Sequence, residues 1–122
     1  MIPSDADDEE IRLRVFFFRS ANGGEPVREW LKELPFAEKK SIGADVKTVQ
    51  FGWPLGMPLV RKISPGLWEI RSTLQNRIAR IFFTVEDHRM ILLHGFIKKS
   101  QKTPGEDLSL ALDRLAQVRG EK

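Results

Sequence analysis

Three strand-like segments follow one another near the carboxyl end, joined by connections of only a few residues. LWEIRSTL (67–74) alternates apolar and polar side chains, and RIARIFFTV (77–85) places most of its apolar residues on one face. The third segment, MILLHGFIK (90–98), is apolar on both faces, as expected of a strand that is covered on both sides. Short connections between successive strands favour an antiparallel meander. This feature constrains the fold more than any other.

The segments upstream supply one more strand and two helices. IRLRVFFFR (11–19) has a strand pattern, and the turn cluster SANGGEP ends at Pro26, which suits the first position of a helix. Apolar residues at helical spacing then predict two successive helices separated by Pro35, one carrying Val27, Trp30, Leu31 and Leu34, and the other Ile42, Val46 and Val49. LVRKI (59–63) and the turn SPG lead into the meander.

A last helix is predicted over residues 104–119. Thr103 can cap it, Pro104 suits its first position, and Glu106 completes a capping box. Its apolar stripe, which we expect to pack on the sheet and in which Leu112→Ala should behave as a core truncation, comprises Leu108, Ala111, Leu112, Leu115 and Val118.

The predicted fold class is therefore α+β, with the order β-α-α-β-β-β-α and an antiparallel sheet packed against helices. At 122 residues the chain is long enough for one domain, which we assign to residues 11–119. Residues 1–10 contain five acids and are expected to form a mobile acidic tail.

Composition excludes several classes of site. The chain has no cysteine, which excludes disulfides and thiolate chemistry, and its two histidines make a metal centre improbable, so we expect no metal and no cofactor. No apolar run approaches the ~20 residues of a membrane helix, and the amino terminus does not resemble a signal peptide. A cytoplasmic protein without membrane contact is the expectation.

The charge of the chain is unevenly distributed. Residues 53–103 carry nine lysines and arginines against three acids, a net charge of +6, whereas the whole chain carries +3. A basic centre indicates an anionic partner. Nucleic acid, an acidic protein and a membrane surface all meet that description, and nucleic acid is the usual one.

Strand parity brings several polar residues to one side of the predicted sheet. Arg71 and Arg80 lie opposite the apolar faces of adjacent strands, while His94, Phe96 and Lys98 share a parity on the next strand, with Lys99 at its end. RNA cleavage without a metal needs groups that accept and donate protons, and fixed cations for the phosphorane charge. We expect Arg71 and Arg80 to hold the phosphate, and His94 to transfer a proton. An aromatic ring such as Phe96 can hold an unstacked base.

Each of these residues also has a structural interpretation. Arg71 can pair with Glu69, and Lys98 and Lys99 can be solvated groups at a strand end. His94 can be a hydrogen-bonded core histidine, and Phe96 can be a core aromatic. His88 is expected to be structural, and Asp107 and Asp113 are expected to be ordinary acids of a helix surface.

The segment LLHGFIKKSQKTPGEDLSLALDRL, with LWEIRSTL and RIARIFF before it, resembles the RelE/ParE toxin superfamily, in particular its phage-derived HigB-like branch. The resemblance covers about residues 55–115. It implies a small toxin of a type II toxin–antitoxin pair, an mRNA interferase that cuts mRNA on the ribosome and arrests translation. It also implies neutralisation by an antitoxin, often a helix-turn-helix protein, so that contact with DNA occurs only through the antitoxin.

By this resemblance, Arg80 matches the superfamily's catalytic-face arginine on the middle strand, and Lys98 and Lys99 fall where the nuclease branch keeps a basic pair after the last strand. The strand lysines of RelE nucleases fall at Leu67 and Glu69, and the chain has no tyrosine. The proton-transfer group is then His94, Lys62, Lys98 or Glu69, or is absent. The predicted catalytic residues are Arg80, Arg71, His94 and Lys99, and the predicted RNA-binding residues are Lys62, Arg61, Lys98 and Phe96.

Two other functions fit the same fold. A ParE-like toxin would inhibit a protein such as gyrase and would need no catalytic groups. A phage-derived regulator would keep the fold and antitoxin binding without activity. For the nuclease, Arg80→Ala is expected to abolish growth inhibition without unfolding the protein.

Overall fold

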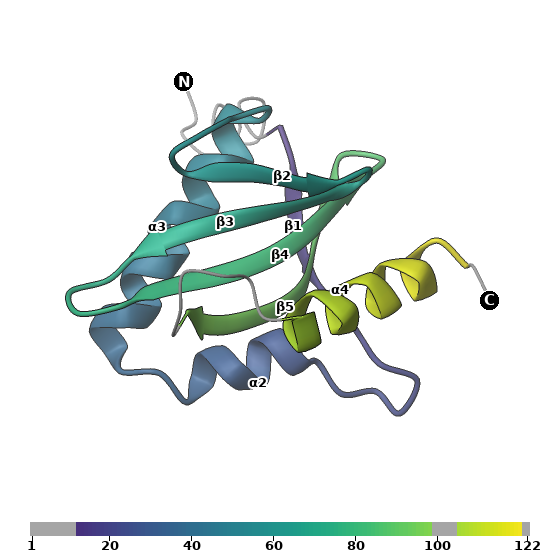
Figure 1. Ribbon diagram of the computed structural model, residues 1–122, viewed down its shortest axis with the longest axis horizontal. Coiled ribbons are helices and arrows are strands. Elements are labelled where there is room, and N and C mark those ends of the chain that lie inside the picture. Colours follow the sequence, from purple (N-terminus) through teal and green to yellow (C-terminus); the bar gives the residue numbers. More distant parts are fainter. Residues whose placement is uncertain (1–11, 99–104, 121–122) are drawn as a thin grey trace, which may run out of the picture.

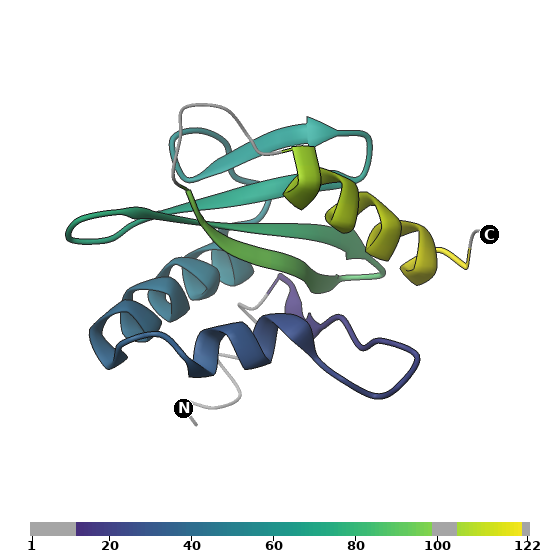
Figure 2. The ribbon, with the colours of Figure 1, turned by 60° about the horizontal axis from the view of Figure 1, so that its bottom comes forward.

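A computed structural model describes residues 12–98 and 105–120 of the chain. The elements are β1 (Arg14–Phe17), α2 (Pro26–Lys32), α3 (Phe36–Gly52), β2 (Val60–Ser64), β3 (Leu67–Thr73), β4 (Ile78–Glu86), β5 (Arg89–Lys98) and α4 (Gly105–Val118). They form a five-stranded sheet in the order β1-β5-β4-β3-β2. Helices α2 and α3 cover one face of this sheet, and α4 lies across the other (Figures 1 and 2).

The antiparallel meander is confirmed for β2, β3, β4 and β5. Two details of the predicted order are wrong. Four strands follow the helices instead of three, because the segment after residue 59 pairs as a full strand with β3. The sheet is also mixed, since β1 runs parallel to β5. After β1 and the two helices, the chain enters the sheet at its far edge with β2. The meander then runs back across the sheet, so that β5 lies beside β1.

The first core lies between the sheet and the helices α2 and α3. Val27 on α2 and Ile42, Val46 and Val49 on α3 are buried, as their spacing predicts. They contact the sheet face that carries Ile70, Ile81 and Phe83. Trp53 packs edge-on against Trp68 and Phe83 at the end of this core.

The second core lies under α4. Ala111 and Leu115 are buried against Leu67, Phe82, Leu93 and Phe96, while Leu108 and Val118 are partly buried beside them. Leu112 does not belong to this core, because 41% of it is exposed. The predicted helix is confirmed, but its stripe is narrower than expected. Thr103 and Pro104, the predicted start of the helix, lie outside the described residues, as does the predicted acidic tail.

Two local features fix the positions of side chains on β5. The hairpin between β4 and β5 turns at Asp87 and His88, both with positive φ, which is the backbone of the tight two-residue hairpins. Further along, Phe82 pairs with His94 and Phe83 with Leu92, so Leu93 is the extra residue of a β-bulge. Leu93 is therefore buried on the α4 face together with the ring of His94.

Candidate functional site: a basic face of the sheet

The sheet register collects four cations on the face that α4 covers in part. Arg61 on β2 pairs with Glu69 on β3, and Arg71 on β3 pairs with Arg80 on β4. Arg80 in turn pairs with Phe96 on β5, and Lys98 lies two residues beyond Phe96 on the same face. We call the four cations Arg61, Arg71, Arg80 and Lys98, together with the acid Glu69, the basic cluster.

Glu69 is the acid of the basic cluster and is fully buried. Its Oε2 lies 3.2 Å from a guanidinium nitrogen of Arg80, whose side chain is only 1% exposed. The carboxylate of Glu69 is thus held by its ion pair with Arg80. Arg61, Arg71 and Lys98 add positive charge around the same carboxylate.

The basic cluster shifts the proton affinities of its members. Burial raises the pKa of Glu69, and this effect exceeds the opposite effect of the four cations. The pKa of Lys98 is lowered by desolvation first, and then by the charges of Arg80 and Arg71. Desolvation also lowers the pKa of Arg80, but a guanidinium remains protonated near neutral pH. The site therefore combines a carboxylate that accepts a proton more readily than usual with an ammonium that loses one more readily.

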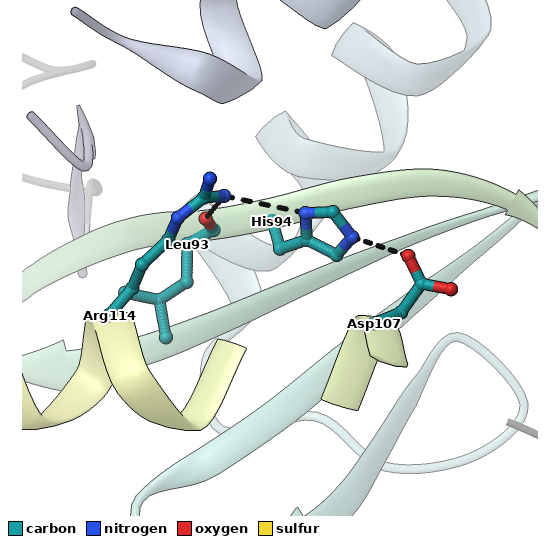
Figure 3. Close-up of polar contacts among 4 residues, drawn as sticks. All are labelled: Leu93, His94, Asp107 and Arg114. Atoms are coloured by element: carbon teal, nitrogen blue, oxygen red, sulfur yellow. Dashed lines mark hydrogen bonds and ion pairs between the residues drawn. The ribbon is translucent and has the colours of Figure 1, made fainter. Parts of the chain in front are cut away.

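His94 lies beside the basic cluster, in contact with α4. Its Nε2 donates to Oδ1 of Asp107 at 2.6 Å, which places the proton of the neutral ring on Nε2 (Figure 3). Its Nδ1 lies 3.4 Å from Nη1 of Arg114, which also donates to the carbonyl of Leu93 at 2.8 Å. Both ring nitrogens are therefore engaged. The interpretation of Asp107 as an ordinary surface acid is wrong, because it connects α4 to β5.

Aromatic rings extend from His94 toward the basic cluster. The His94 ring stacks at 5.6 Å from the ring of Phe96, and Phe82 lies 5.5 Å from Phe96 on the adjacent strand. Phe96 is only 8% exposed and belongs to the second core. In this conformation it supports the face and offers little area on which a base could stack.

The structure does not bring every predicted residue together. Lys62 pairs with Trp68, which packs on the α2 and α3 side, so Lys62 lies on the opposite face from Arg61. Lys99 lies outside the described residues. Glu69 was predicted only as one alternative for proton transfer, whereas it is the centre of the basic cluster. The signal for this role was an acid on the same strand parity as Arg71, in a segment that is otherwise rich in cations.

The described residues contain no group of three or more histidines, cysteines or acids that could hold a metal. None of the helices in this part of the chain is long and apolar enough to cross a membrane.

The fold and the site define a small α+β domain with a basic cluster on one face of its sheet. The chain belongs to the family described as phage derived protein Gp49-like (DUF891), whose profile matches residues 29–116. This family is a phage-derived domain of the toxin–antitoxin type within the RelE/HigB-like toxin superfamily. The resemblance to the superfamily is thereby confirmed. No curated protein matches the chain.

Proposed function

We propose that the chain is the toxin of a type II toxin–antitoxin pair, of the HigB-like branch, and that it cuts mRNA on the ribosome without a metal. One observation carries the proposal: four cations gather around a buried carboxylate on one face of the sheet. Cleavage at a phosphodiester needs fixed positive charge for the phosphorane and groups that move protons. The basic cluster offers both.

The roles follow from accessibility and proton affinity. Arg61 is exposed and Arg71 is partly buried, so these two guanidiniums are placed to hold phosphate oxygens in pairs. Glu69, with its raised pKa, suits the acceptance of the 2′-hydroxyl proton, and Lys98, with its lowered pKa, suits donation to the leaving oxygen. Arg80 holds the Glu69 carboxylate in place. Because Glu69 is buried, the proposal requires the side chains around it to move when RNA binds.

This assignment differs from the one based on the sequence. His94 was expected to transfer the proton, but its ring nitrogens are engaged by Asp107 and Arg114. We therefore propose that His94 positions α4 and the ring of Phe96, and that proton transfer belongs to Glu69 and Lys98.

The burial of Arg80 favours a second candidate function. An arginine that is 1% exposed and paired with Glu69 can serve the fold alone. The chain would then be a ParE-like inhibitor of a protein such as gyrase, or an inactive regulator that still binds an antitoxin, and its exposed cations would contact a protein partner.

Neighbouring residues on β2 provide a matched test. Arg61 and Lys62 are adjacent exposed cations. Arg61 belongs to the basic cluster, whereas Lys62 lies on the opposite face of the sheet. After induction of each variant, growth and the 5′ ends of cellular transcripts are measured by primer extension. Arg61→Ala, which loses a phosphate contact, and Lys98→Ala, which loses the proton donor, should each reduce cleavage at least about tenfold, and Lys62→Ala should not.

Two other outcomes would contradict the nuclease activity, and a third would contradict its assignment to the basic cluster. Growth arrest with intact transcripts and inhibited DNA supercoiling would favour the ParE-like function. An absence of both effects, with retained antitoxin binding, would favour the inactive regulator. Equal loss of cleavage in the Arg61 and Lys62 variants would show that general charge, and not the basic cluster, supports the activity.

A further inference from the structure

β1 is an edge strand of the described sheet. Within residues 12–98 and 105–120 its one partner strand is β5, with Arg14 N donating to His88 O and Phe18 N donating to Leu92 O, both at 2.9 Å. Backbone groups alternate in direction along a strand, so the N–H and C=O of Val15 and Phe17 face away from β5. Among residues 12–98 and 105–120 these groups have no hydrogen-bond partner.

The two edges of the sheet differ in their side chains. The β2 edge presents the exposed cations Arg61 and Lys62, and charged residues of this kind normally protect an edge from pairing with another chain. The β1 edge is apolar for most of its length, RVFF, and Phe16 at its middle is 45% exposed. The β1 edge therefore has a single charged residue, the exposed Arg14 at its start, and is less protected along the rest of its length.

A groove runs beside this edge, between β1 and the last turns of α4. It encloses about 400 Å³, and its apolar walls come from Phe16, Phe18, Ile91 and Val118. Arg19 and Arg89 also line it. Such a groove can receive the side chains of a strand that pairs with β1, because alternate side chains of that strand would point to the α4 face.

The charge around the edge specifies the partner. Arg14 pairs directly with Arg89 across β1 and β5, and like charges in this arrangement repel each other. Arg14, Arg19 and Arg89 are exposed, and none of them forms an ion pair with a described acid. Glu86, one of the acids nearby in the sequence, is within 3.9 Å of Arg119. Acidic side chains supplied from outside would relieve the repulsion.

We propose that the outer edge of β1 and the adjacent groove bind an extended, acidic segment of a partner protein, which adds to the sheet as a sixth strand. Strand addition satisfies the donors and the acceptors of Val15 and Phe17 together, and alternate side chains of the segment fill the groove. RNA phosphates could contact the arginines, but they would leave the outward N–H and C=O groups without the ladder that an edge strand offers. The proposal holds whether or not the chain cuts RNA, since it concerns a different part of the sheet.

The probe for this site is a capped ten-residue peptide with threonine at every second position and with glutamate and valine in turn at the positions between, so that glutamate and valine can both face the α4 side, where Arg14, Arg89 and the groove lie. Two matched peptides serve as controls, one N-methylated at alternate residues so that it cannot form a ladder, and one with lysine in place of glutamate. Binding to the full chain is measured by calorimetry, and amide exchange at Val15 and Phe17 is followed by NMR. The glutamate peptide should slow exchange at both amides, and the other two peptides should bind at least about tenfold more weakly.

Charge variants of the protein complete the test. Arg14→Glu and Arg89→Glu should each weaken binding of the glutamate peptide about tenfold or more. Lys40→Glu makes the same change of charge at an exposed position of α3 and should leave binding unchanged. Equal binding of the N-methylated peptide would overturn strand addition, because only charge would then matter. A single-stranded oligonucleotide that protects these amides better than the peptide would overturn the protein partner.

Discussion

Arg80 and Glu69 form an ion pair inside the protein, with 3.2 Å between the guanidinium and the carboxylate and exposed fractions of 1% and 0%. The two residues are diagonal neighbours, since Arg80 pairs with Arg71 and Glu69 lies two positions before Arg71. Burial of both ions costs free energy that their attraction repays only in part. Removal of either residue would therefore leave the charge of the other buried without its counterion.

Arg80→Ala should destabilise the protein by about 3–5 kcal/mol, because the Glu69 carboxylate remains buried without its main counterion. Urea denaturation measures this change. The double variant Glu69→Leu/Arg80→Met should recover most of the loss, since no buried charge remains. An Arg80→Ala protein as stable as the wild type would restore the sequence-based expectation that Arg80 can be removed without unfolding.

Glu69→Gln should alter the pH dependence of stability. The pKa of Glu69 is raised above its ordinary value of 4.5. Between pH 4.5 and the raised pKa of folded Glu69, the folded protein binds more protons than the unfolded chain. The free energy of unfolding therefore falls as pH rises through that window. The glutamine variant lacks this decline, so its stability relative to the wild type should rise with pH from about pH 4 upward, on top of a constant loss from leaving Arg80 without a carboxylate. Parallel curves from pH 4 to 8 would mean that Glu69 is not desolvated as described.

The sequence could predict features that arise within one strand, but not those that depend on how two strands pair. The parity of Arg71, Arg80 and His94 follows from alternation within a strand, and the register confirms that they share one face. The ion pair of Glu69 with Arg80 could not be predicted, since it depends on the exact register between two strands. Lys62 and Arg61 were both predicted to bind RNA, but as adjacent residues of a strand they face opposite sides of the sheet.

Local sequence patterns also could not predict contacts between distant segments. Nothing local marks β1 as parallel to β5, because the two strands are separated by most of the chain. The stripe of α4 predicted burial of Ala111 and Leu115 correctly, but it could not show that Leu112 stays 41% exposed.

The two leucines of α4 provide a direct comparison. Leu115 is 3% exposed, so Leu115→Ala should cost about 2–5 kcal/mol through lost burial and a cavity. Leu112 is 41% exposed, so Leu112→Ala should cost less than about 1 kcal/mol. Thermal or urea denaturation of both variants measures the difference. Equal costs would mean that α4 is rotated relative to the structure.

At Gly95 even the methyl group of an alanine is expected to lower the stability of the protein. A Cβ built at Gly95 would lie 2.4 Å from the ring of Trp30, which packs from α2 onto the sheet. Gly95→Ala should therefore destabilise the protein by about 1–3 kcal/mol through overpacking. Gly43→Ala is the control, since its Cβ would meet no atom within 4 Å and alanine favours the helix by about 0.5–1 kcal/mol. A neutral Gly95→Ala would show that Trp30 moves away freely.

His94 decides between a role in proton transfer and a role in holding α4. Because Asp107 and Arg114 engage both ring nitrogens, we expect His94→Gln and Asp107→Ala to destabilise the docking of α4 alike, by about 1–3 kcal/mol. Amide exchange of α4 measures this directly. Asp113→Ala removes the same charge from an exposed position of the same helix and should leave exchange unchanged.

Cleavage must then be compared at matched stability. If His94 only positions α4, the His94 and Asp107 variants should lose cleavage in step with their loss of helix protection, and low temperature should restore much of it. If His94 transfers the proton, His94→Gln should abolish cleavage at temperatures where its helix exchanges as slowly as in the wild type. That second result would return the proton-transfer role from Glu69 to His94, and would require the bond to Asp107 to orient the ring for catalysis.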